Sequence, residues 1–293
     1  MKQKKIIAAV IMSFVLMGLQ SCDFSKQKEV QQEHREIFLV YTDWSESIAL
    51  NELSAYLLEH ELDYKVRTKL IDVKSAYDEL AKGNADVFTD AWLPNTQQVY
   101  YDKYADKLDL LGVMYREAKV GLVVPSYSEL QKVEDLKLYS DPIIGVDSGA
   151  GLMHKTRMVQ QKYKLQAQLI DGSEQVMIEK LRYALKRRNN IVITGWEPHW
   201  IFARYEVRFL DDPDNLFGEK EKIYTVSKKD FKKGHPKAAK FFERMQLTEK
   251  QLNTLVYEVY LSEDPLNGVE KWIKNNEPIV NQWVKGLQSD NEK

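Results

Sequence analysis

The stretch Ile191-Val192-Ile193-Thr194-Gly195-Trp196 is a short apolar run that ends close to a tryptophan. Two other runs have the same form. Phe38-Leu39-Val40-Tyr41 precedes Trp44, and Val87-Phe88 precedes Trp92. Apolar runs of this length, separated by helical stretches, predict the buried strands of a parallel α/β sheet. Because the ligand crevice of such a sheet lies outside the carboxyl ends of its strands, we expect the three indoles to meet at one cleft.

Indole rings carry negative potential on their faces, so a cluster of them is suited to a quaternary ammonium ion. A single tryptophan at such a place is more simply explained as a core or domain-interface residue. Three tryptophans at equivalent topological positions favour the cage. Trp272 and Trp283 do not follow strands, and we expect them to serve packing.

The N-terminus has the pattern of an export signal. Lysines at positions 2, 4 and 5 precede an unbroken apolar run at 6–19, which is too short to span a bilayer but suits a signal-peptide core. The run ends in Leu19-Gln20-Ser21-Cys22, which looks like a bacterial lipobox, and Cys22 is the only cysteine of the chain. A buried structural cysteine fits poorly beside so polar a sequence as 23–36. We therefore expect residues 1–22 to be a lipoprotein signal peptide with its lipidated Cys22, and 23–35 to be a flexible tether.

The charge balance argues against a nucleic-acid partner. The chain has 42 basic and 44 acidic residues, and the two signs are interspersed. No later segment of the sequence is apolar enough over a sufficient length to span a bilayer. We expect a protein held at the cell membrane only through its lipid anchor, and facing the periplasm or the cell exterior.

Alternating patterns predict two α/β lobes. Strands are expected at 36–41, 64–71, 86–89, 108–114, 119–125, 143–146, 167–170, 191–194, 206–210 and 221–226. Helices are expected at 46–61, 73–82, 95–105, 149–163 and 173–187, and from 236 onward. Gly83 is expected to cap the second helix. The first lobe comprises 36–119 plus 223–288 and the second 120–222, so two extended crossovers would form a hinged cleft.

A glycine-rich turn lies between a strand and a helix in Gly145-Val146-Asp147-Ser148-Gly149-Ala150-Gly151-Leu152-Met153. Such a turn lets a ligand approach the backbone, and the amides at a helix start bind anions. The turn does not match the nucleotide-binding glycine patterns, and a tight turn without a ligand is the simpler alternative. A carboxylate on the amides of Gly151 and Leu152, with a quaternary ammonium group in the indole cage, describes a betaine.

Several motifs in order resemble one family. They are Asp90-Ala91-Trp92-Leu93-Pro94-Asn95-Thr96, Gly121-Leu122-Val123-Val124-Pro125-Ser126-Tyr127, the glycine-rich turn, Gly195-Trp196-Glu197-Pro198-His199-Trp200, and Asp212-Pro213. Over 36–285 the chain resembles the glycine betaine substrate-binding proteins of ABC transporters, in the OpuAC-like branch. The resemblance implies a two-lobed periplasmic-binding-protein-like fold of type II. It also implies a prism of Trp44, Trp92 and Trp196 around the trimethylammonium group, with the amides of Gly151 and Leu152 on the carboxylate. Its implied partners are an ABC permease and an ATPase on separate chains, and we expect a monomer.

The chain departs from the family at Gln97, where many members have a histidine that donates to the ligand carboxylate. A glutamine amide also donates, so carboxylate binding can survive. The change can instead indicate carnitine, a larger betaine or choline as ligand. Glu46 would then meet a ligand hydroxyl, although a solvated position at the helix start is the simpler expectation.

The sequence does not favour an enzyme. It has no GxSxG elbow, Ser148 has no obvious partner, and the five histidines lack metal-ligand spacing. We expect His199 to make a structural hydrogen bond at a helix start. No catalytic residue, metal or cofactor is therefore predicted. A tethered sensor or adaptor with the same pocket remains the alternative to a transport receptor.

Overall fold

The computed structural model describes residues 36–288, and all of them belong to one compact unit. The strands are β1 (Glu36–Tyr41), β2 (Lys65–Leu70), β3 (Val87–Leu93), β4 (Leu108–Pro125), β5 (Ile143–Ile144), β6 (Leu169–Ile170), β7 (Val192–Glu197), β8 (Val207–Phe209) and β9 (Glu221–Lys228). The helices are α2 (Ser45–His60), α3 (Val73–Lys82), α4 (Gln98–Asp102), α5 (Gly151–Tyr163), α6 (Glu174–Arg187), α7 (Ile201–Arg204), α8 (Phe231–Gly234), α9 (Pro236–Arg244), α10 (Glu249–Leu261), α11 (Pro265–Asn275) and α12 (Glu277–Val284), with 3₁₀ turns η1 (Ala105–Lys107) and η2 (Val133–Leu138).

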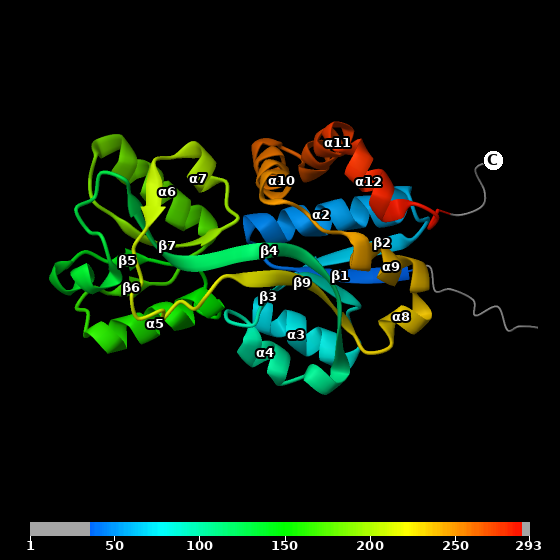
Figure 1. Ribbon diagram of the computed structural model, residues 1–293, viewed down its shortest axis with the longest axis horizontal. Coiled ribbons are helices and arrows are strands. Elements are labelled where there is room, and N and C mark those ends of the chain that lie inside the picture. The colour runs from blue at the N-terminus through cyan, green and yellow to red at the C-terminus, as the bar shows by residue number, and fades with distance from the viewer. Residues whose placement is uncertain (1–35, 289–293) are drawn as a thin grey trace, which may run out of the picture. The chain divides into compact units, whose positions relative to one another are not determined.

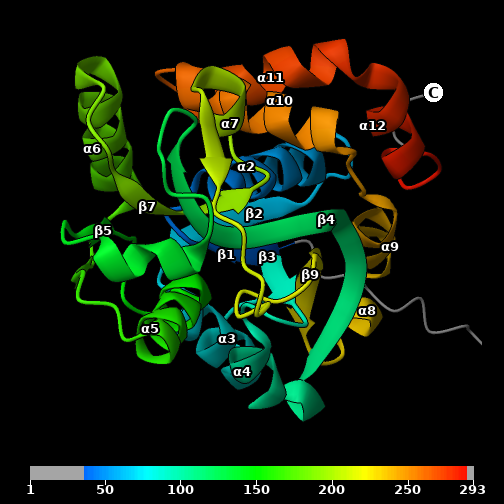
Figure 2. The same ribbon diagram turned by 60° about the vertical axis from the view of Figure 1, so that its left-hand side comes forward.

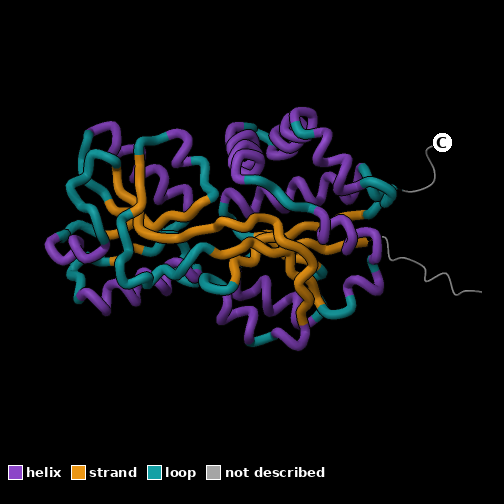
Figure 3. The backbone as a smooth tube through the Cα atoms, viewed as in Figure 1, coloured by secondary structure: helices purple, strands orange, loops and turns teal. Residues whose placement is uncertain are grey.

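One path of hydrogen-bonded strands passes through both lobes, in the order β2-β1-β3-β9-β4-β7-β5-β6, with β8 also on β4. β1 pairs in parallel with β2 and β3, and β5 pairs in parallel with β6 and β7. The long strand β4 is antiparallel to β9 through Ala118 and antiparallel to β7 from Lys119 onward. Figure 1 shows β4 running from one lobe into the other, and the tube in Figure 3 shows the strands as a band between the helices.

Two expectations about the sheet need correction. The sheet is mixed rather than parallel, because β4 and β9, which carry the crossovers, run antiparallel to their neighbours. The predicted strands 108–114 and 119–125 form one strand of 18 residues. β4 stays paired with β9 through its polar middle because the register shifts at three places. These shifts lie between Leu110 and Gly112, between Val113 and Tyr115, and between Tyr115 and Ala118. The lobe boundaries at 119/120 and 222/223 remain a prediction.

Local sequence signals explain the helix bounds that frame the cleft. Asp72 accepts a hydrogen bond from the amide of Ser75 and caps α3 at its start, and Gly83 caps its end at a φ of 77°, as predicted. Helices α10 and α11 pack on α2, and Figure 2 shows both beside it. This packing fixes α2, whose first turn reaches the cleft.

Trp272 and Trp283 are packing residues, as predicted. Each side chain is 1% exposed, and the two rings stack at a centroid distance of 6.3 Å. The Nε1–H of Trp272 donates to the carbonyl oxygen of Gln251 at 3.0 Å. Trp272 lies in α11, which packs on α2, and Trp283 lies in α12, which packs on α9 and α11, so both contribute to the stability of this group of helices.

The predicted signal peptide, Cys22 and the tether lie outside the described residues. None of the helices within residues 36–288 has both the length and the hydrophobicity that crossing a membrane requires.

Candidate ligand-binding site

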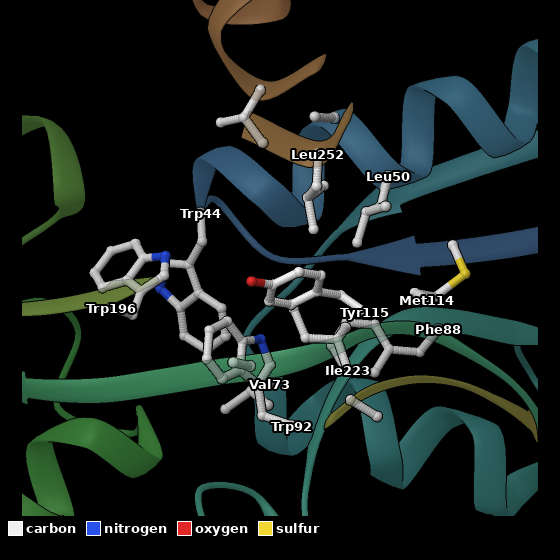
Figure 4. Close-up of a cluster of buried hydrophobic side chains, with 14 of the residues drawn as sticks. Trp44, Leu50, Val73, Phe88, Trp92, Met114, Tyr115, Trp196, Ile223 and Leu252 are labelled. Atoms are coloured by element: carbon white, nitrogen blue, oxygen red, sulfur yellow. The ribbon is translucent and has the colours of Figure 1, made fainter. Parts of the chain in front are cut away.

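The three predicted tryptophans line a single small cavity. Trp44 stands at the N-cap of α2, Trp92 lies in β3 and Trp196 lies in β7. Their side chains are 7%, 3% and 4% exposed, and Figure 4 shows the indoles gathered beside one another at one end of the core. The strands β3 and β7 continue through Trp92 and Trp196 instead of ending before them, because both residues pair within the sheet.

The cavity also contains the other predicted site residues. Gly151, Leu152 and Gln97 all line it. The remaining lining residues are Glu46, Thr96, Val120, Val146 and Ala150. The structure therefore brings together residues that are up to 152 positions apart in the sequence (44 to 196), with apolar, aromatic and hydrogen-bonding groups around one small space.

Two of the three indoles donate to buried carboxylates. Trp92 Nε1 donates to Asp90 Oδ1 at 2.8 Å, and Trp196 Nε1 donates to Glu46 Oε2 at 2.8 Å. Trp44 Nε1 is buried without a hydrogen-bond partner in the described part of the chain. The donations orient the rings of Trp92 and Trp196, since a buried indole N–H requires an acceptor.

The expectation of a solvated Glu46 is wrong. This side chain is 1% exposed and lines the cavity. Burial, with the nearby carboxylates of Asp90 and Glu174, raises the pKa of Glu46 well above its usual range. Burial also raises the pKa of Asp90 to about 8. The sequence reasoning assigned Asp90 no role of its own, although the spacings Trp44-x-Glu46 and Asp90-x-Trp92 were visible signals.

The start of α5 offers the amides expected for an anion. Gly151 is the first helical residue, and the amides of the first turn have no acceptor within the helix. The two preceding amides already have acceptors, because the Gly149 amide donates to Asp147 Oδ1 at 2.9 Å and the Ala150 amide donates to the Asp147 carbonyl at 3.1 Å. The amides of Gly151 and Leu152 thus remain at the positive end of the helix dipole, beside the cavity.

Gln97 is fully buried and held from two sides. Its Oε1 accepts from the Tyr77 hydroxyl at 3.0 Å, and its Nε2 donates to the Asp90 carbonyl oxygen at 3.2 Å. A primary amide has two N–H groups, so one donor remains for a ligand. The structure therefore fixes the orientation of Gln97, while its role toward a carboxylate stays a prediction.

Polar contacts join the two walls of the cleft. The Tyr100 hydroxyl donates to the Gly149 carbonyl at 2.7 Å, and the Ser45 amide donates to Glu174 Oε2 at 2.8 Å. The Ser45 hydroxyl also contacts Glu174 Oε1. Glu174 Oε1 lies 3.1 Å from His199 Nε2, and His199 Nδ1 accepts from the Ile201 amide at 3.1 Å, which is the structural hydrogen bond predicted for this histidine.

The described residues contain no group of three or more histidine, cysteine, aspartate or glutamate side chains suited to a metal ion. The aromatic faces of the cavity can hold a desolvated cation, and the amides at the start of α5 can hold an anion.

Two α/β lobes joined by crossing strands, with a small cavity at their meeting edge, define a periplasmic-binding-protein-like fold of type II. The comparison with family models identifies the family. Residues 35–275 match OpuAC, the substrate binding domain of the ABC-type glycine betaine transport system, and the chain belongs to this family.

Individual relatives agree with this family assignment. The glycine betaine/carnitine transport binding protein GbuC of Listeria monocytogenes is 36% identical over 182 residues, which are 61% of this chain and 60% of the relative. The chain thus spans less than two thirds of the length of that curated relative. Lactococcal OpuAC in a closed form with glycine betaine is 34% identical, with a TM-score of 0.80 over 86% of this chain and 100% of that chain. A Borrelia burgdorferi ProX structure, described as a glycine betaine, L-proline ABC transporter binding protein, is 26% identical, with a TM-score of 0.80 over 86% and 97%.

Proposed function

We propose that this chain is a lipid-anchored extracytoplasmic binding protein that captures glycine betaine or a related quaternary ammonium osmolyte for uptake by an ABC transporter. The observation that carries the proposal is the meeting of Trp44, Trp92 and Trp196 with the start of α5 at one cavity. The cage suits the trimethylammonium group, and the amides of Gly151 and Leu152 suit the carboxylate. Family membership supports the same ligand class.

The expected binding free energy is that of a transport receptor. Three desolvated cation–π contacts contribute about 1–2 kcal/mol each, and a charge-assisted carboxylate clamp contributes about 2–3 kcal/mol. Part of this sum offsets the loss of ligand freedom, so micromolar affinity, about −8 kcal/mol, is expected. A primary ammonium group is rejected because it would leave its hydrogen bonds to water without replacement.

Carnitine is the second candidate ligand. The Listeria relative is described as binding glycine betaine and carnitine, and Gln97 stands where many family members have histidine. Choline, which has no carboxylate, is the third. The relatives are named as binding proteins of transporters rather than as enzymes, which supports a non-catalytic role.

The partners and the attachment belong to the same proposal. A permease and an ATPase on separate chains would receive the ligand, and the alternative is a tethered sensor or adaptor. Cys22 would carry the lipid, with 23–35 as the tether. Labelled palmitate should enter the native protein in bacterial cells and be absent from Cys22→Ser. Incorporation into both would contradict the anchor.

Titration of the purified full chain with glycine betaine, carnitine and choline tests the ligand. Tryptophan fluorescence reports binding and calorimetry gives the affinity. Micromolar binding of glycine betaine with weak choline binding is the expected result, since both the cage and the carboxylate clamp are then engaged. Tight choline binding would reassign the ligand, and binding of none of the three would overturn the proposal.

A further inference from the structure

Two buried carboxylates are hydrogen-bonded to the indole cage. Asp90 is 0% exposed and Glu46 is 1% exposed, and each accepts an indole N–H at 2.8 Å. The two acids stand on different elements, β3 and α2, yet each meets a tryptophan of the same cavity. Glu46 also lines the cavity itself.

Neither carboxylate has a positive partner. Among the residues that the structure describes, no lysine, arginine or histidine nitrogen lies within 4.0 Å of either one. Asp90 Oδ2 is buried without a hydrogen bond of ordinary geometry in the same set, and the neighbouring Ser47 hydroxyl, which favours the ionised form of Asp90, carries no charge. Buried carboxylates are ordinarily paired with a cation or a metal ion. A protonated acid needs no such partner, whereas an ionised acid at this cavity would be balanced by a cationic ligand.

A purely structural need for acceptors does not explain two acids. A glutamine or asparagine oxygen, or a carbonyl, orients an indole equally well and avoids the cost of burying an ionisable group. A quaternary ammonium ion cannot donate hydrogen bonds, so it leaves the indole-to-carboxylate bonds in place and interacts with the acids through charge alone.

We infer that Glu46 and Asp90 are positioning residues that make the indole cage select a cationic head group over a neutral one of the same shape, with proton release on binding. The inference rests on the proposed function. In the ligand-free cleft, burial raises the pKa of Asp90 to about 8, and burial with its neighbouring carboxylates raises the pKa of Glu46 well above its usual range. The entering cation stabilises the ionised form, so the pair loses a proton.

The sign of the pH dependence follows from linkage. The bound state has the lower carboxylate pKa, so affinity for a cation rises with pH through about 8, the value for Asp90 in the empty cleft. The other titratable groups around the pair come from neighbouring elements. They are Glu174 beside Glu46 and Tyr77 beside Asp90, with Asp43 and His199 near Glu174 and Glu221 near Tyr77.

The test compares glycine betaine with tert-butylacetate, in which a carbon replaces the ammonium nitrogen. Both ligands are titrated calorimetrically into the full chain at about pH 6 and pH 8.5, in two buffers with different ionisation enthalpies. For the wild-type chain, glycine betaine should bind about tenfold more tightly at the higher pH, with a proton released at the lower pH. The affinity for tert-butylacetate should not rise with pH.

Glu46→Gln and Asp90→Asn keep an acceptor for each indole and remove the charge. At pH 8.5, the ratio of the affinities for glycine betaine and tert-butylacetate should be about tenfold lower in each variant than in the wild-type chain. The affinity for glycine betaine should also vary less with pH in each variant. Equal losses for both ligands in both variants, or a wild-type preference that does not vary with pH, would overturn the inference while the proposed function stands. Absence of wild-type binding to any quaternary ammonium ion would overturn both. The pH dependence of the wild-type affinity and the number of protons released on binding are measured without any variant, so they test the inference even if a variant fails to fold.

Discussion

A Cβ atom on Gly151 would lie 1.9 Å from the carbonyl oxygen of Thr96. The first residue of α5 and the loop after β3 therefore touch backbone to backbone at the rim of the cavity. Real Cβ contacts are never so short, and the obstacle is a main-chain atom that no rotamer change can remove. Glycine at position 151 is thus a condition for the closed contact between the two walls of the cleft, in addition to supplying an amide.

Gly151→Ala should hold the cleft open. The added methyl group meets Thr96, so the indoles of the two lobes cannot close on a ligand, and we expect a loss of affinity for glycine betaine of about a hundredfold. Calorimetric titration measures the loss. Gly149→Ala is the matched control in the same turn, because a Cβ atom there would meet only a side-chain atom, Asp147 Oδ1, at 3.2 Å. Equal affinities of the two variants would contradict the steric argument.

Much of this arrangement was accessible from the sequence. The apolar runs before Trp44, Trp92 and Trp196 located three strands, and the motif 145–153 located the start of α5. These signals are local, since strand burial and helix capping depend on a few neighbouring residues. The rule that parallel strands present their carboxyl ends at one edge accounts for Trp44 and Trp92, which lie at the ends of the parallel neighbours β1 and β3. It does not account for Trp196, because β7 lies beyond the antiparallel strands β9 and β4.

The parts that could not be predicted depend on distant contacts. A glutamate in the first turn of a helix is normally solvated, and the burial of Glu46 requires Trp196, 150 residues away. The fixed orientation of Gln97 requires the hydroxyl of Tyr77 on another helix. The continuity of β4 requires bulges opposite β9, which no periodicity in 108–125 reveals.

The cage tryptophans should be distinguishable from the packing tryptophans. Trp44→Ala, Trp92→Ala and Trp196→Ala each remove a cation–π face of about 1–2 kcal/mol, so affinity should fall about tenfold or more. Trp272→Ala should leave the affinity of the folded protein unchanged while reducing the free energy of unfolding by about 3–5 kcal/mol. Calorimetry and denaturant unfolding separate the two effects. Similar affinity losses from all four variants would exclude the cage.

Tyr77→Phe tests the role of Gln97. Loss of the hydroxyl leaves the Gln97 oxygen unpaired in a buried place, so the amide is no longer held with its free N–H toward the ligand. We expect the affinity for glycine betaine to fall about fivefold, corresponding to about 1 kcal/mol. Choline serves as the control ligand because it has no carboxylate, and its affinity should not change. A parallel loss for both ligands would show that Gln97 acts only in packing.

The stability of the ligand-free protein should decrease as the pH rises through neutrality. The pKa of Asp90 is about 8 in the folded state, against a usual value of 3.8, so between these values the folded state holds a proton that the unfolded state has lost. The contribution of Asp90 to the free energy of unfolding therefore falls with pH in that window and is constant above about pH 8. Burial of Glu46 acts in the same direction. Asp90→Asn should reduce the slope, as measured by denaturant unfolding at several pH values.

Asp78→Asn is the control for this slope. Hydrogen bonds from Lys74 and Tyr104 lower the pKa of Asp78 to about 2, so this group contributes stability above pH 4 that is lost as the pH falls through about 2. Its removal should leave the trend between pH 5 and pH 8 unchanged, although the protein becomes somewhat less stable. If Asp90→Asn and Asp78→Asn gave the same slope as the wild-type chain, Asp90 would not hold its proton in the empty cleft. Saturating glycine betaine should flatten the wild-type slope, because the bound cation stabilises the ionised carboxylates.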